Sequence, residues 1–349
     1  MKKLKIAQIA PLWLSIPPKK YGGTERIISI LTEELVKRGH KVTLFAPKTS
    51  VTKAKLISLI DDGLIDCGFS WLNDYHWNLF HHSFVFEQAD SFDIIHCHWN
   101  GIGVFFQKFI KTPVVHTMHN NLSPTRELNW KPFYYYKNEF KPIFVSKSEK
   151  KICPIKFKNS WVIYNSIDTS QFSFNPQPKE HFIWIARLSP EKGAPAAIKI
   201  AKKAGVKLLL AGQIQSHHQV YFDKEVKSLL DKDIQYVGEL SQEQLSGFYG
   251  SAKGCLYPIT WEEPFGLVMA EAMACGTPVI VFDRGSAREV VKDGETGFVV
   301  KNINEAVGAV KKIDQIDRND CRKWVEQNFT IEKMVDEYEK VYFKILRKK

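Results

Sequence analysis

Short apolar runs alternate along the chain with longer segments in which apolar residues recur every three or four positions. An apolar run at 4–10 is followed by such a segment at 24–39 and by a second run at 41–46. The apolar positions of 24–39 fall on one face of a helix: Ile27, Ile28, Leu31, Leu35 and Val36. A Pro- and Gly-rich loop separates the first run from this helix. The pattern predicts an opening strand–loop–helix–strand unit of the Rossmann type.

The same alternation continues to the end of the chain. Further strands of the first half are expected at 93–98, 112–118, 142–146 and 161–164. In the second half we expect strands at 182–186, 206–210, 234–237, 255–259 and 279–282, with helices at 194–204, 219–230 and 242–251. Two helices, 317–328 and 331–346, close the chain. Strands that alternate with helices form a parallel sheet covered on both faces, so the predicted fold class is α/β.

The segment 261–281 carries two carboxylates beside a nearly all-apolar helix. We expect this helix at 264–274, since Pro264 suits a first helical position, and a buried strand at 277–282. Glu263 and Glu271 are eight residues apart, which on a helix would separate them by about 12 Å along the axis and about 80° around it. They could therefore contact distant parts of one long ligand, with phosphates on the free N–H groups between them. Alternatively, Glu263 only complements the helix dipole and Glu271 is exposed.

The run Glu263-Pro264-Phe265-Gly266…Glu271, with Gly-Thr-Pro-Val after it, resembles the E-x7-E element of retaining GT-B glycosyltransferases, especially glycosyltransferase family 4. The resemblance implies two Rossmann-like domains facing across a cleft. We expect an acceptor-side domain at 1–165, a nucleotide-sugar-binding domain at 166–325, and a C-terminal helix at 326–349 that packs back on the first domain. It also implies that Glu263 contacts the donor sugar, that Glu271 holds the ribose, and that Gly266 and Leu267 bind the diphosphate.

Two loops resemble phosphate-binding loops of this family. Gly22 and Gly23 stand directly before the first helix, where bare backbone lets an anion approach the helix N-terminus; an ordinary flexible turn is the alternative. Arg187 and Lys192 follow a strand, and a tight turn there would bring both onto one anion. Ala186 stands where the family usually has Gly, and we expect little effect from this difference.

The remaining candidates also follow strands. His119 ends an expected strand and resembles the family's histidine near the donor sugar, which makes it a candidate catalytic residue together with Glu263; His98 is a weaker candidate. Val237, Glu239 and Leu240 resemble the loop that contacts the nucleotide base. The turn at 165–168 resembles the family's NGID turn, but Ser166 replaces Gly. We expect the turn at 293–298 to be hairpin-like.

The composition is that of a globular protein, with 44% apolar and 25% charged residues. Its 349 residues suffice for two domains with separate cores. Six cysteines without a C-x-x-C pair argue against a disulfide framework or a structural zinc site and fit a reducing compartment. We expect the basic N-terminus to lead into a strand rather than to be a signal peptide. No run of about 20 apolar residues is present, so we expect no membrane-spanning helix.

The net charge of +11 is concentrated in the first half, where residues 1–150 contribute +7. Such an excess could serve an anionic membrane surface, an anionic acceptor or nucleic acid, or it could be a solvated surface without a partner. The segment 130–141 interleaves aromatics with lysines, which suits stacking on single strands or an interfacial membrane patch. A helix that packs its aromatic side on the core is the favoured alternative.

An aromatic-rich segment at 71–86 holds His76, His81 and His82, which we interpret as ordinary residues because they lack Cys or carboxylate ligands at metal spacing. Its aromatic residues are Trp71, Tyr75, Trp77, Phe80, Phe84 and Phe86.

The resemblance implies an enzyme that moves a sugar from a nucleoside diphosphate sugar to an unidentified acceptor, which could be a glycan, a lipid-linked molecule or a small molecule. It implies retention of configuration, a UDP sugar slightly preferred over a GDP sugar, and no cofactor. We expect metal independence, because the basic loop can do the work of a metal. We also expect a cytoplasmic location, with peripheral attachment to the inner membrane face left open, and no nucleic-acid partner.

Two other functions remain open: a nucleotide-sugar epimerase of the same fold, and a catalytically silent sugar-nucleotide-binding protein. A dehydrogenase is disfavoured because no G-x-G-x-x-G fingerprint follows the first strand.

Overall fold

The computed structural model describes residues 2–69, 75–99, 101–122 and 127–347. Contacts within the chain divide it into two compact units, 1–166 together with 331–349, and 167–330. The expected domain boundary near 165 lies close to this division. The chain returns to the first unit after Thr330, whereas the sequence placed this return at 326.

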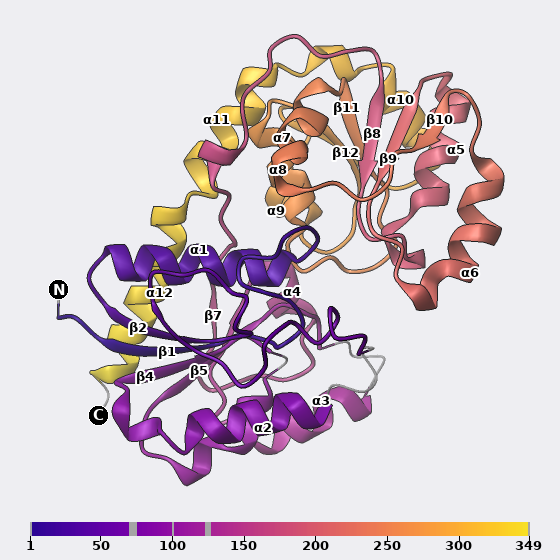
Figure 1. Cartoon of the computed structure of the whole chain (residues 1–349). Helices are drawn as coiled ribbons and strands as arrows, with labels where there is room; N and C mark the ends of the chain where they lie inside the picture. The colour runs from indigo at the N-terminus through magenta and orange to yellow at the C-terminus, as the bar shows by residue number, and fades with distance from the viewer. Residues whose placement is uncertain (1, 70–74, 100, 123–126, 348–349) are drawn as a thin grey trace. The chain divides into compact units, whose positions relative to one another are not determined.

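The first unit is built on a parallel sheet with the order β3-β2-β1-β4-β5-β6-β7. Its strands are β1 (Lys5–Ile9), β2 (Lys41–Phe45), β3 (Lys55–Ile57), β4 (Ile94–Cys97), β5 (Val114–Met118), β6 (Pro142–Phe144) and β7 (Trp161–Val162). Its α-helices are α1 (Gly23–Lys37), α2 (Tyr75–Phe86), α3 (Glu127–Tyr135), α4 (Lys147–Ile152) and α12 (Ile331–Leu346). Figure 1 shows α1 and α12 on one side of this sheet and α2 and α3 on the other.

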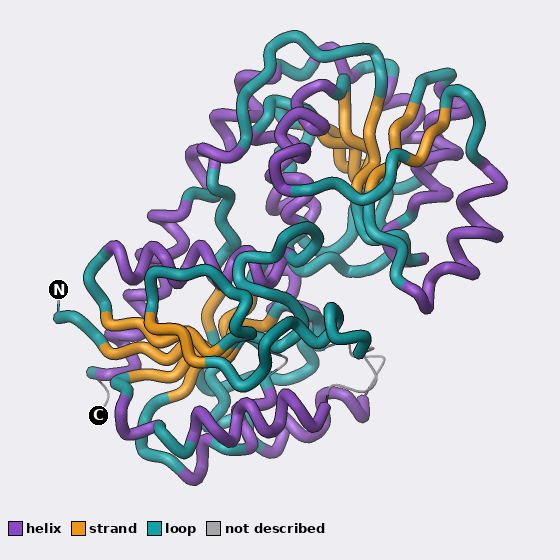
Figure 2. The backbone as a smooth tube through the Cα atoms, in the orientation of Figure 1, coloured by secondary structure: helices purple, strands orange, loops and turns teal. Residues whose placement is uncertain are grey.

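The second unit repeats the architecture with the order β10-β9-β8-β11-β12-β13, again all parallel. Its strands are β8 (Phe182–Ile185), β9 (Leu208–Ala211), β10 (Ile234–Tyr236), β11 (Gly254–Tyr257), β12 (Val279–Phe282) and β13 (Gly297–Val300). Its α-helices are α5 (Ala194–Ala204), α6 (Gln219–Tyr221), α7 (Gln242–Ser251), α8 (Leu267–Ala274), α9 (Ala287–Val290), α10 (Ile303–Val310) and α11 (Arg318–Asn328). In each unit the strands form one layer between helices (Figure 2), so the α/β prediction is confirmed.

Several elements differ from their prediction. The helix expected at 219–230 is broken into α6, a π-helical segment at Phe222–Val226 and a 3-10 turn at Lys227–Leu229. The turn expected to be hairpin-like leads instead into β13, which runs parallel to β12. Helix α2 was not predicted, because its apolar residues surround the whole helix and show no single stripe. Trp71, one of the aromatic residues noted before this helix, lies outside the described residues.

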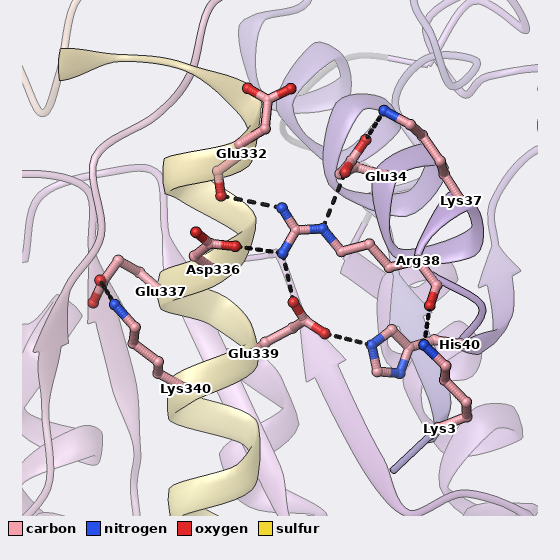
Figure 3. Close-up of polar contacts among 10 residues, drawn as sticks. All are labelled: Lys3, Glu34, Lys37, Arg38, His40, Glu332, Asp336, Glu337, Glu339 and Lys340. Atoms are coloured by element: carbon pink, nitrogen blue, oxygen red, sulfur yellow. Dashed lines mark hydrogen bonds and ion pairs between the residues drawn. The ribbon is translucent and has the colours of Figure 1, made fainter. Parts of the chain in front are cut away.

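Helix α12 is anchored to the first unit by an ion-pair cluster (Figure 3). The Arg38 guanidinium lies 2.6 Å from an Asp336 oxygen and 2.5 Å from Glu339 Oε2. His40 Nε2 lies 2.8 Å from the other Glu339 oxygen. Since His40 Nδ1 accepts the Leu4 N–H, its Nε2 carries the proton that it donates to Glu339. The last helix is therefore fixed by charged hydrogen bonds to the segment 38–40 between α1 and β2, with the Glu339 carboxylate buried.

Candidate active site

The strand order of the second unit reverses between β8 and β11, and this is where ligands bind in open parallel sheets. The loops that follow these two strands approach each other closely. Thr260 N–H donates to the Glu191 carbonyl, and a Cβ on Gly193, whose φ is +75°, would lie 2.1 Å from the Pro258 carbonyl oxygen. Glycine is therefore required at 193 to let the two loops meet.

A buried ion pair joins these two loops. Lys192 Nζ lies 2.7 Å from Glu263 Oε2, and the two residues are 9% and 7% exposed. Tyr257 and Trp261 each donate to the same oxygen at 2.9 Å. The Lys192 ammonium also lies 4.7 Å from the centre of the Trp261 ring. One oxygen of Glu263 thus takes three donors, while no described residue donates to its Oε1.

Helix α8 begins at Leu267, so the prediction of a helix from Pro264 was wrong. Gly266 is its N-cap with a φ of +77°, and a Cβ there would lie 2.6 Å from Met269 Cε. Because 263–266 are not helical, the spacing of about 12 Å and about 80° expected for Glu263 and Glu271 does not apply. The N–H of Met269 donates to the Gly266 carbonyl at 3.0 Å, whereas the N–H groups of Leu267 and Val268 precede the intrahelical hydrogen bonds. Their position after β11 keeps them candidates for binding the diphosphate.

Glu271 is buried inside the second unit rather than exposed. The Tyr249 hydroxyl, from α7, donates to Glu271 Oε2 at 2.7 Å. The partner lies 22 positions away in the sequence and could not be identified from it.

Arg187 and Lys192 lie in the same loop but contact different carboxylates. Arg187 Nη2 lies 2.8 Å from Glu191 Oε1, which also accepts the Ser189 hydroxyl at 2.6 Å. Burial raises the pKa of Glu191, but these two donors outweigh burial and lower the pKa below its usual value. Each cation therefore has its own carboxylate, and the expected shared anion would have to bind beside these two ion pairs.

The candidate base loop follows β10 at the edge of the second sheet. Val237 is 43% exposed, and Gly238, at a φ of +89°, accepts the Gly212 N–H through its carbonyl. Glu239 and Leu240 follow it, both partly buried. The loop is thus tied to the loop after β9 and carries an exposed apolar side chain that a flat base could cover.

In the first unit, Gly22 is the N-cap of α1 and Gly23 its first residue. A Cβ on Gly22 would lie 2.7 Å from Pro18 Cβ and 3.1 Å from Glu25 Oε2. Burial raises the pKa of Glu25 to about 7. A protonated Glu25 would not repel an anion that approached this turn.

The candidate histidines follow neighbouring strands, β4 and β5. His119 Nε2 lies 3.3 Å from His98 Nδ1, and His98 Nε2 lies 2.7 Å from Gln8 Oε1. Burial lowers the pKa of His119 to about 4 and holds that of His98 well below its usual value. Both imidazoles are therefore neutral near pH 7.

A second set of buried polar side chains continues from the His119–His98–Gln8 contacts. Tyr342 OH lies 2.7 Å from His96 Nδ1 and accepts the Gln8 amide at 3.4 Å. His96 Nε2 lies 2.7 Å from Thr117 Oγ1, which in turn lies 3.0 Å from Tyr338 OH. The two tyrosines belong to α12, so the last helix contributes to the surroundings of the histidines.

Other histidines of the first unit have local roles. His82 Nδ1 contacts the Asn78 carbonyl within α2, and His81 Nε2 contacts the Phe45 carbonyl. Among the residues that the structure describes, no three His, Cys, Asp or Glu side chains gather as a metal site.

Sequence reasoning missed four hydrogen-bonding residues that surround the candidates: the buried Gln8, Tyr249 and Tyr257, and the partly buried Trp261. Trp261, two positions before Glu263, was close enough in sequence to suggest a contact. Tyr257 lies six positions before Glu263, at the end of β11, whereas Gln8 and Tyr249 contact their candidates through the tertiary fold. The departure at Ser166 leaves a buried hydroxyl for which no partner is found among the described residues.

Two family models match consecutive parts of the chain. The Glycosyltransferase Family 4 model matches 21–171, and the model described as Glycosyl transferases group 1 matches 166–329. An uncharacterized glycosyltransferase of Methanocaldococcus jannaschii is 25% identical over 356 residues, which cover 89% of each chain.

Solved structures share the fold. Sucrose-phosphate synthase from Thermosynechococcus elongatus has a TM-score of 0.79 at 20% identity and covers 100% of both chains. The Anabaena protein HepE, in complex with UDP and glucose, has a TM-score of 0.77 at 17% identity and covers 98% of this chain and 100% of its own. Both the predicted fold and the predicted family are confirmed, and the chain belongs to the GT-B glycosyltransferases of family 4 type.

Proposed function

We propose that this glycosyltransferase moves a sugar from a nucleoside diphosphate sugar to an acceptor with retention of anomeric configuration. The observation that carries the proposal is the buried Lys192–Glu263 pair at the point where the second sheet reverses its strand order. It places a cation and a carboxylate side by side at the edge where ligands bind in such sheets. The complex of HepE with UDP-glucose supports a donor of this class.

The chemistry requires stabilisation of a leaving diphosphate. When the bond between the sugar and the phosphate breaks, negative charge develops on the diphosphate, and fixed positive groups stabilise it. Lys192 has three N–H donors, so it can keep Glu263 and still donate to a phosphate oxygen. Arg187 and the first N–H groups of α8 would supply further donors. In this arrangement the leaving group takes the acceptor proton, and no enzyme nucleophile is needed.

Glu263 is suited to hold the sugar. Its Oε2 is occupied by Lys192, Tyr257 and Trp261, and its Oε1 keeps its lone pairs for a sugar hydroxyl. Glu271 is proposed to hold the ribose hydroxyls, with Tyr249 fixing one of its oxygens. Val237 is proposed to cover the base, and we retain UDP as the slightly preferred nucleotide over GDP.

The test is a panel of UDP, GDP and ADP sugars in a thermal-shift assay, followed by product analysis with candidate acceptors. We expect one nucleotide class to raise the melting temperature, because a ligand that binds only the folded state stabilises it. Conversion of the donor without an acceptor would instead identify an epimerase. Stabilisation without turnover across the acceptor panel would identify a silent binding protein.

Metal independence is part of the proposal, since the cations of the β8 loop would do the work of a metal. Turnover in excess EDTA should equal turnover in added Mg²⁺. Loss of turnover with EDTA that Mg²⁺ restores would contradict it.

The protein is further proposed to act in the cytoplasm at an anionic membrane face, through an aromatic–lysine surface formed by Lys108, Phe109, Tyr134, Tyr135 and Lys137. Phe109 is 84%, Tyr135 74% and Tyr134 51% exposed. Lys108 Nζ lies 4.9 Å from the Tyr135 ring centre. Aromatic rings beside lysines suit an interfacial layer of anionic lipid. The other aromatics of this segment, including Phe133 and Phe140, pack in the core as the alternative interpretation predicted.

No helix among the described residues is long and apolar enough to cross a membrane. Attachment is therefore tested by cosedimentation with vesicles of phosphatidylcholine, with and without roughly one third phosphatidylglycerol. Replacing Phe109 and Tyr135 by Ser should abolish binding to the anionic vesicles, whereas Val220→Ser, which removes an apolar side chain at a 64% exposed site of the second unit, should not. Equal binding of both variants would remove this surface from the proposal. Binding to a uridine oligonucleotide but not to vesicles would identify a nucleic-acid surface instead.

A further inference from the structure

The buried polar groups around His119 form one continuous row rather than separate pairs. In the first part of the row, His119 contacts His98, His98 contacts Gln8, and Gln8 contacts Tyr342. The second part runs from Tyr342 through His96 and Thr117 to Tyr338. Apart from His119 itself, which is partly buried, every member is at most 1% exposed. Each hydrogen of the row must therefore be shared within the row, because water cannot replace a partner.

The three histidines of the row are neutral, and this makes each link directional. Burial holds the pKa values of His96 and His98 well below the usual value and lowers that of His119 to about 4. A neutral imidazole has one N–H donor and one lone pair. If one nitrogen of such a ring donates, the other must accept. The direction of one link thus determines the direction of the next.

The amide of Gln8 sets this direction for His98. The amide oxygen faces His98 Nε2 at 2.7 Å, and the amide nitrogen faces the Tyr342 hydroxyl at 3.4 Å. His98 Nε2 must then carry the proton, and His98 Nδ1 must hold the lone pair. The nitrogen that faces His98 Nδ1 at 3.3 Å is His119 Nε2, which must therefore be a donor. The remaining nitrogen of His119, Nδ1, is left as an acceptor.

The other end of the row agrees with this direction. Tyr342 accepts from the Gln8 amide, so its own hydrogen is free to donate to His96 Nδ1. His96 Nε2 then donates to Thr117, and the Thr117 hydroxyl donates to Tyr338. Every link contains one hydrogen and one lone pair, and no link pairs two donors or two acceptors.

We infer that His98 and Gln8 are positioning residues that hold His119 in its Nε2–H tautomer and present Nδ1 as a hydrogen-bond acceptor. The role of His119 beside a donor sugar is implied by the family resemblance, and for that role the inference rests on the proposed sugar transfer. There, a fixed acceptor would receive a sugar hydroxyl and could not donate to it. The tautomer itself does not depend on the reaction and can be tested without a substrate.

The first test measures the tautomer directly. In protein labelled with 15N-histidine, two-bond 15N–1H couplings near pH 7 distinguish the Nε2–H form from the Nδ1–H form, and the signals lost in His119→Gln assign the residue. We expect the Nε2–H pattern for His119. In Gln8→Met, which keeps the side-chain length but lacks the amide, we expect the His119 pattern to shift towards a mixture of both forms. An Nδ1–H pattern in the wild type, or an unchanged pattern in Gln8→Met, would overturn the inference whether or not the protein transfers a sugar.

The second test uses the two amides that imitate the two nitrogens of His98. In His98→Asn the side-chain oxygen takes about the place of Nδ1 and can still accept from His119. In His98→Gln the amide reaches the place of Nε2 and leaves His119 without its acceptor. We expect His98→Asn to keep kcat within about threefold of wild type. We expect His98→Gln to lose about tenfold or more in kcat with little change in the donor KM. A tenfold loss corresponds to about 1.4 kcal/mol of activation free energy. Melting curves of both variants exclude loss of the fold, and equal kcat values for two folded variants would overturn the positioning role.

Discussion

At the scale of single residues, the two glutamates of the E-x7-E element meet the cost of burial in different ways. Glu263 gathers a cation and two neutral donors on one oxygen, whereas for Glu271 the structure shows a tyrosine hydroxyl on one oxygen. A carboxylate with a buried ammonium partner is held in one orientation, since the pair would be costly to separate. This difference leads us to expect different losses when each carboxylate is replaced.

Glu271→Gln should weaken the binding of every nucleotide that carries a ribose, whether or not a donor sugar is attached. It should also reduce discrimination against 2′-deoxynucleotides. The expected loss is about 1.5–3 kcal/mol, the value of one hydrogen bond to a charged group. Glu263→Gln should spare the free nucleoside diphosphate and lower kcat for the intact donor, because it removes an interaction that matters most in the transition state. Titrations with diphosphate and donor, alongside steady-state rates, separate the two. Identical profiles for both variants would refute this division of roles.

Arg187→Ala and Lys192→Ala should each weaken the binding of the nucleoside diphosphate by about 1.5–3 kcal/mol. The binding of the bare nucleoside should stay nearly unaffected. The reason is that both cations lie in the loop after β8, where only the phosphates are proposed to reach them. Calorimetric titration of each variant with both ligands measures the difference. Lys199→Ala, at an exposed position of α5, serves as the control. A loss of equal size for the nucleoside would place these cations elsewhere in the site.

Sequence reasoning located the candidates but not their partners. Arg187, His119 and Glu263 follow strands, and periodicity places strand ends well. The start of α8 was wrong because Pro264 is favoured at a first helical position, yet the N-cap is Gly266, whose positive φ suits glycine best. The contacts of Glu271 with Tyr249 and of His98 with Gln8 join distant positions, and no local pattern encodes them.

At the scale of elements, α12 is held by specific polar contacts as well as by its apolar face. It follows the second unit in sequence and packs in the first, where Arg38 and His40 hold Glu339. Its apolar stripe, with Val335, Tyr338 and Tyr342 buried, was readable as a helix at 331–346 and is confirmed. In contrast, α2 was not predicted, because a helix whose apolar residues lie on every side shows no helical periodicity of apolar positions.

Arg38→Met should destabilise the first unit by about 2–4 kcal/mol, since it leaves Glu339 buried with His40 as its remaining partner in the cluster. Lys340→Met is the matched control on the same helix. The Lys340 side chain is 69% exposed and, among the described residues, pairs with Glu337 at the surface, so its loss should leave stability nearly unchanged. Urea unfolding monitored by circular dichroism provides the comparison. Equal stabilities would show that the apolar face alone holds α12 in place.

At the scale of the whole molecule, the buried titratable groups with the largest opposing shifts lie in the first unit. Burial lowers the pKa of His81 to about 3, with neighbouring His82 adding to the effect, and lowers that of His82 to about 4. Burial also raises the pKa of Glu25 to about 7 and that of Glu149 to about 8. The two sets act in opposite directions on stability as pH changes.

The signs follow from proton binding in each state. As pH falls from about 6.5 towards 4, the unfolded histidines bind protons that the folded ones cannot, so stability is lost. As pH rises from about 4.5 to 8, the unfolded glutamates release protons that the folded ones retain, so stability is again lost. Histidines with lowered pKa outnumber these two glutamates and dominate below pH 6.5. The first unit should therefore be most stable near pH 6.5 and decline up to about pH 8.

Glu149→Gln isolates the alkaline part of this profile. The Glu149 side chain accepts the Val145 N–H at 2.8 Å, and a glutamine oxygen can accept it equally while never ionising. The free energy of unfolding of the variant, relative to that of wild type, should rise by about 2–4 kcal/mol from pH 5 to pH 9, in keeping with the size of the pKa shift. The measurement is the free energy of unfolding in urea at intervals from pH 4 to pH 9. If the stability of the variant fell between pH 6.5 and pH 8 as steeply as that of the wild type, Glu149 would not stay protonated in the folded protein. In that case the carboxylate at the start of α4 must be charged, and the acceptor at Val145 must be an anion.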